Sequence, residues 1–149
     1  MENKTQQVVE RFRNGYNCAQ SVLSTFADDL EMPVNLSLKL ASPFGSGIAY
    51  LQDTCGAVTG SLMAIGLKFG KGENDTEEKK THAYKVSQQF IAEFKKIHGT
   101  TCCRQLMNGY DMSSPEGMAE IMKDDLFRIN CVRYIRDAVT ITEKLLAEG

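Results

Sequence analysis

The stretch that decides the fold is TEEKKTHAYKVSQQFIAEFKKIHG, residues 76–99. Its apolar residues recur at steps of three and four, and charged residues fill most of the positions between them. The apolar set is Ala83, Val86, Phe90, Phe94 and Ile97. This period is that of one face of an α-helix, and a glycine such as Gly99 commonly ends a helix. We therefore predict an amphipathic helix over about 76–98.

The same period recurs near the C-terminus, where it predicts a second long helix through Ile135, Ala138, Ile141 and Leu145. Shorter helices are predicted over about 6–13, 18–30, 36–41, 55–69, 103–107 and 115–123. No segment alternates apolar and polar residues as a half-buried strand does. The connectors resemble loops between helices, so we predict one all-α domain over 1–149, a bundle of about six to eight helices.

Composition and charge exclude several classes of function. The formal net charge is −2, and no basic stripe gives an electrostatic reason to bind nucleic acid. No run approaches the roughly 20 apolar residues that span a bilayer, so we expect no membrane insertion. The first residues lack the apolar core of a signal peptide, from which we expect a cytoplasmic protein. The sequence leaves open whether the protein forms a homo-oligomer.

Five cysteines carry the chemistry that the sequence offers, at positions 18, 55, 102, 103 and 131. Their odd number and the absence of a leader argue against a secreted disulfide scaffold. Such thiols are inert core residues, metal ligands or redox groups. The long gaps between them match no C-x-x-C pair, zinc ribbon or ferredoxin spacing, and free cysteines often pack simply as small hydrophobes.

Residues that favour helix starts precede the cysteines. These pairs are Asn17-Cys18, Thr54-Cys55, Thr101-Cys102 followed by Cys103, and Asn130-Cys131. Asn and Thr cap helix N-termini through their side-chain oxygen, and Asn17 with Gln20 resembles a capping box. The free amides of a helix N-terminus stabilise a thiolate. We therefore predict thiols at helix starts with thiolate character. The Asn130 pair is the weakest, because that helix could continue from upstream.

The direction of these side chains suggests a shared site. Each of Cys18, Cys55, Cys103 and Cys131 continues the apolar face of its own helix, as Cys18 does with Val22 four residues on. Four inward-facing cysteines could converge on one pocket, although helix ends in a bundle lie at two opposite poles.

Glycines accompany the second of these cysteines in the element Cys55-Gly56-Ala57-Val58-Thr59-Gly60. Glycine inside a helix costs about 1 kcal/mol relative to alanine, which indicates a close neighbour on this face. That neighbour is either another helix or a ligand held against the backbone. Gly56, Ala57 and Gly60 are therefore candidate cofactor-binding residues, together with Gly45 and Gly47 in the preceding tight loop.

Together these residues resemble a known family. Asn17-Cys18-Ala19-Gln20, the 55–60 element, Cys103-Arg104-Gln105-Leu106 and the late Cys131 are similar to the C_GCAxxG_C_C family, whose redox activity is inferred from its cysteines. The similarity runs from about residue 14 to 146. It implies that Cys18, Cys55, Cys103 and Cys131 are the family cysteines and that Cys102 is extra. It carries over no substrate or cofactor.

Three functions stay open from the sequence. The first is thiol–disulfide or electron-transfer chemistry by the four cysteines, as in a thiol-dependent oxidoreductase acting on a redox partner or small molecule. The second is a metal or iron–sulfur cluster held by the same four thiolates. The third is a helical structural or interaction protein with inert core cysteines.

Overall fold

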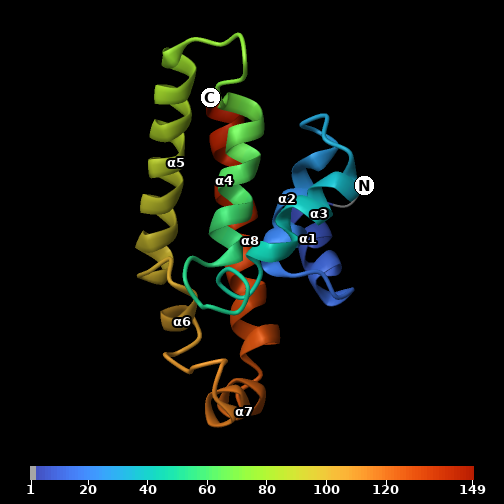
Figure 1. Ribbon diagram of the computed structural model, residues 1–149, viewed down its shortest axis with the longest axis vertical. Coiled ribbons are helices and arrows are strands. Elements are labelled where there is room, and N and C mark those ends of the chain that lie inside the picture. The colour runs from blue at the N-terminus through green and yellow to red at the C-terminus, as the bar shows by residue number, and fades with distance from the viewer. Residues whose placement is uncertain (1–2) are drawn as a thin grey trace.

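Eight α-helices make up most of the computed structural model, which describes residues 3–149 (Figure 1). They are Lys4–Arg13 (α1), Cys18–Ala27 (α2), Val34–Ala41 (α3), Gly56–Phe69 (α4), Glu77–His98 (α5), Cys103–Leu106 (α6), Pro115–Lys123 (α7) and Val132–Glu148 (α8). A 3₁₀ turn, Ser42–Phe44 (η1), follows α3, and a π-helical turn, Phe127–Cys131 (η2), leads into α8. Over these residues no strand forms, so the predicted all-α fold is confirmed.

The long helix α5 has the predicted limits. Thr76 is the extended residue before its first turn, and Gly99 ends it with φ of 83°. Phe90 and Phe94 are fully buried, as their spacing predicts. Ile97 is exposed, however, and the side chain of His98, four residues after Phe94, takes the buried position instead. The apolar face therefore follows the four-residue step to the end of the helix.

The long helices α4, α5 and α8 run beside one another, α1 and α2 pack against them, and α3 packs on α2 (Figure 1). The short helices α6 and α7 lie at the end of the bundle where α5 ends and α8 begins. Buried residues of α2, α4, α5 and α8 form the main core, which includes Phe26, Ile65, Phe90 and Ile135. No helix among residues 3–149 combines the length and apolarity needed to cross a membrane.

The glycines of α4 allow α2 to approach it closely. A Cβ added to Gly60 would lie 2.9 Å from the carbonyl oxygen of Ala19 and 3.1 Å from Cβ of Val22. One added to Gly56 would lie 2.8 Å from the Ala19 nitrogen and 3.0 Å from Cβ of Cys18. The neighbour that the glycines predicted is therefore helix α2, packed backbone against backbone.

We predict that Gly60→Ala destabilises the protein and that Gly66→Ala stabilises it. Both residues lie in α4 and gain up to about 1 kcal/mol of helix propensity. A Cβ at position 60 meets the α2 backbone, and overpacking of this kind costs about 1–3 kcal/mol, whereas nothing lies within 4 Å of a Cβ at position 66. Urea denaturation should therefore shift the two midpoints in opposite directions, and a stabilising Gly60→Ala would refute the close contact.

Candidate functional site

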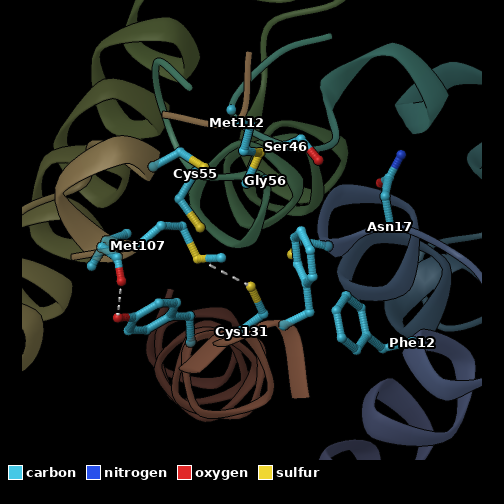
Figure 2. A pocket seen from close by; sticks show the side chains of 14 residues that line it. Phe12, Asn17, Ser46, Cys55, Gly56, Met107, Met112 and Cys131 are labelled. Carbon is cyan, nitrogen blue, oxygen red and sulfur yellow. Dashed lines mark hydrogen bonds between the residues drawn. The ribbon is translucent and has the colours of Figure 1, made fainter. Parts of the chain in front are cut away.

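The four family-type cysteines line one small cavity, of about 50 Å³ (Figure 2). Cys18, Cys55, Cys103 and Cys131 reach it from α2, the start of α4, α6 and η2. Cys18 is half-buried and the other three are buried. The convergence predicted from the apolar faces is thus present in the structure, and Cys102 is not part of the lining.

A capping box fixes the position of Cys18. The side chain of Asn17 accepts a hydrogen bond from the Gln20 amide at 2.9 Å, and the Gln20 side chain accepts one from the Asn17 amide at 3.0 Å. These bonds satisfy amides at the start of α2, which makes Cys18 the first residue of the helix, as predicted.

An isolated antiparallel bridge between Thr54 and Cys102 brings Cys55 and Cys103 together. The Cys55 amide donates to the Thr101 carbonyl at 2.8 Å, and the Cys103 amide donates to the Asp53 carbonyl at 2.6 Å. Side chains alternate between the two faces of an extended strand, so Cys55 and Cys103 share one face and Cys102 points to the other. The Cys102 thiol instead donates to the Gln52 carbonyl at 3.4 Å.

The bridge also corrects two predicted caps. Cys55 and Cys102, not Thr54 and Thr101, occupy the N-cap positions of α4 and α6, and neither makes a side-chain cap hydrogen bond. The reason is that Thr54 still belongs to the extended bridge, so α4 begins one residue later than a threonine cap requires.

The prediction of a helix start at Cys131 is wrong. Its backbone is helical, with φ of −61° and ψ of −37°, and η2 continues into α8 without a break. Asn130 lies inside this turn and is not a cap, and Cys131 has no free helix-start amides to stabilise a thiolate. Single π-turns inside helices often occur at functional sites, and here the turn delivers Cys131 to the cavity.

The loop before Cys55 has an unusual backbone that sequence patterns do not reveal. Five consecutive residues, 46–50, have φ between 52° and 70°, a conformation that costs about 1–2 kcal/mol for each residue with a Cβ. Ser46 and Gly47 line the cavity. A Cβ on Gly47 would lie 2.6 Å from Cβ of Cys103, so glycine is needed there to bring the loop against this thiol.

Buried Gln52 holds this loop in place. Its side-chain amide donates to the Tyr110 carbonyl at 2.9 Å, and its side-chain oxygen accepts from the Met112 amide at 2.7 Å. Its own carbonyl accepts from the Arg104 amide at 3.3 Å. One side chain therefore ties the loop to the segment that follows α6, a role that no motif signals.

The predicted cofactor-binding residues separate into two groups. Gly47 and Gly56 line the cavity. Gly60 packs against α2, Gly45 packs against the Asn17 side chain, and Ala57 is fully buried in the main core. These last three do not reach the cavity, and a role for any of the five in binding a cofactor stays a prediction.

Apolar and sulfur-containing side chains complete the cavity wall, and sequence patterns did not single them out. They are Phe12, Leu106, Met107, Met112, Phe127 and Tyr134. The Cys131 thiol donates to the sulfur of Met107 at 3.7 Å, and the Tyr134 hydroxyl donates to the Leu106 carbonyl at 2.7 Å (Figure 2). Met107 therefore contacts a family-type cysteine directly.

The electrostatics of the site correct the prediction of stabilised thiolates. Interaction with the Cys131 side chain, followed by burial, raises the pKa of Cys18 well above its usual value. Burial is also the main cause that raises the pKa of Cys55 and of Cys103 to about 12, and neighbouring thiols add to it. Desolvation of a buried charge outweighs the helix-start amides here. The three thiols are therefore protonated at neutral pH.

The spacing of the potential metal ligands limits which metal ions the cavity can bind in this conformation. Within residues 3–149, no three His, Cys, Asp or Glu side chains are placed to share one metal ion. Neither histidine lines the cavity, and His98 instead packs against Phe94 and Tyr134, with its Nε2 2.9 Å from Asp137 Oδ2 but out of hydrogen-bond geometry.

Fold and site together define an all-helical protein in which four distant cysteines line one cavity. A family model described as "Putative redox-active protein (C_GCAxxG_C_C)" matches residues 16–145. The chain therefore belongs to this family, as the resemblance of its motifs implies. No curated protein and no solved structure matches the chain.

We predict that alkylation of Cys55 and Cys103 by iodoacetamide keeps accelerating about tenfold per pH unit from pH 8 to 10, because only the thiolate reacts and each pKa is about 12. In urea the same thiols have ordinary pKa values near 9.0, so their alkylation rate should level off above that pH. Rates are read per cysteine by peptide mass spectrometry. A native rate that levels off near pH 9 would contradict the raised pKa values.

Proposed function

We propose that the protein carries out two-electron thiol–disulfide chemistry with Cys18 and Cys131 as the reacting pair. The observation that carries the proposal is that the Cys18 and Cys131 thiols interact in one cavity, although one belongs to α2 and the other to η2. Neighbouring thiols can close a disulfide when their Cα atoms come within about 4.4–6.8 Å of each other.

The reaction that we propose is exchange with an external disulfide, either of a small molecule or of a partner protein. The Cys18 thiolate attacks one sulfur of that disulfide, and the first external thiol leaves. The Cys131 thiolate then attacks the Cys18 sulfur of the mixed disulfide, and the second external thiol leaves. Two protein thiols are oxidised, the external disulfide is reduced to two thiols, and the protons pass from the protein to these products.

The order of attack follows from exposure. Cys18 is half-buried, whereas Cys131 is only 7% exposed, so an external disulfide reaches Cys18 first. The raised pKa of Cys18 means that little thiolate exists at neutral pH. The exchange is therefore slow at pH 7 and accelerates at alkaline pH, unless a bound partner supplies a base.

A second function has its own support. Four thiols from four parts of the chain surround a single cavity, which is the donor set that soft metals and iron–sulfur clusters prefer. No three of these thiols are placed to share one ion. Binding of a single ion by all four thiolates would therefore require the side chains to move closer together. A cluster with several metal atoms can bind thiolates that lie farther apart. Metal analysis of the protein as purified separates this function from the first.

A cytoplasmic location stays a prediction.

We predict that oxidised glutathione converts the reduced protein to a form with a Cys18–Cys131 disulfide, identified by peptide mapping. Cys131→Ser should instead stop at a mixed disulfide of glutathione with Cys18, because the resolving thiol is missing. Cys18→Ser should lose most of the reaction at the cavity.

The matched control is Cys102→Ser, which removes a thiol that faces away from the cavity and should leave the Cys18–Cys131 disulfide unchanged. Mixed disulfides confined to Cys102, or internal disulfides that form equally well without Cys18, would contradict the proposal.

A further inference from the structure

Cys18, Cys131 and Met107 bring three sulfur atoms to the wall of one cavity. The Cys18 and Cys131 thiols are close enough to interact, and the Cys131 thiol lies 3.7 Å from the sulfur of Met107. All three residues line the cavity, and Met107 is only 1% exposed. Two thiols and a thioether are thus already neighbours, although they belong to different segments of the chain.

We infer that Cys18, Cys131 and Met107 form a binding site for a monovalent copper ion, Cu(I). This inference rests on the metal-binding alternative above, narrows it to one class of metal, and adds a ligand that is not one of the four family-type cysteines.

The donor set favours Cu(I) over harder or borderline ions. Thiolates and thioethers are soft ligands that select Cu(I), whereas structural Zn²⁺ sites take four Cys, His or carboxylate donors. Over residues 3–149 not even three such donors are placed together. Cu(I) is satisfied by two or three soft donors, and here the third is the neutral sulfur of Met107.

The cavity suits such an ion in size and polarity. Its volume of about 50 Å³ exceeds that of an ion or a single water molecule. Its wall beyond the sulfur atoms includes the apolar side chains of Phe12 and Phe127, which offer no hard oxygen ligand that would favour the divalent ion. The ion with two thiolates carries a single negative charge, less than the two that bare thiolates would place there.

Binding is coupled to proton release. Two Cys–S–H bonds break, two Cu–S bonds to thiolate form, two protons pass to solvent, and Met107 adds its lone pair without losing a proton. No electron is transferred. Because both thiols must lose their protons, apparent affinity rises with pH.

The test is anaerobic titration of the reduced full-length protein with Cu(I) in competition with bathocuproine disulfonate. Every variant in this titration also carries Cys102→Ser, so that the partly exposed Cys102 thiol does not bind copper. We expect one ion per chain, affinity that rises between pH 6 and 8, and no comparable site for Zn²⁺. Met107→Leu, which conserves volume, should weaken binding at least about tenfold.

The matched control is Met122→Leu, at an exposed methionine of α7, which should leave the affinity unchanged. Unchanged affinity in Met107→Leu, retained binding in Cys18→Ala with Cys131→Ala, or a preference for Zn²⁺ would each overturn the inference. Met107→Leu should still form the Cys18–Cys131 disulfide with oxidised glutathione, so failure of the copper site and failure of the thiol–disulfide function give different results.

Discussion

The backbone contact between α2 and α4 is the constraint on which the site depends. Gly56 and Gly60 leave room for Ala19 of α2 to lie directly against the backbone of α4. Cys18 precedes Ala19, and Cys55 precedes Gly56, so the same contact sets two thiols beside each other. The glycines thus act through packing: they cost helix propensity, and in return the helices approach closely enough for the cysteines to share one cavity.

The positions of the remaining two thiols, Cys103 and Cys131, depend on different structural features. Two backbone hydrogen bonds of an isolated bridge align Cys103 with Cys55, and a π-helical turn brings Cys131 to the same place. Burial in this common, largely apolar cavity explains why Cys18, Cys55 and Cys103 are protonated although Cys18 and Cys103 begin helices. Thiols held close together in this way are suited to chemistry in which they lose their protons, either when a thiolate attacks an external disulfide or when thiolates bind a soft metal.

The helices and part of the site follow from local sequence signals, whereas the rest depends on contacts between distant segments. The three-and-four spacing in α5 and the Asn17 capping box predict their elements closely, because periodicity and capping are properties of one segment. The start predicted at Cys131 is wrong, since a cap residue such as Asn130 also occurs inside a continuous helix. The positive φ of residues 46–50 and the contact of Met107 with Cys131 are set by tertiary packing, and no local pattern announces them.

The central claim is that Cys18 and Cys131 are in contact in the reduced protein, and a double-mutant cycle tests it most directly. The free energy of unfolding would be measured in reductant for Cys18→Ala, Cys131→Ala and the double variant, with Cys102→Ala and Cys131→Ala as the comparison cycle. Residues in contact couple by about 0.5–3 kcal/mol, so the account predicts non-additivity of that size for Cys18 with Cys131 and additivity for Cys102 with Cys131. Additivity within about 0.3 kcal/mol for the first pair would contradict it.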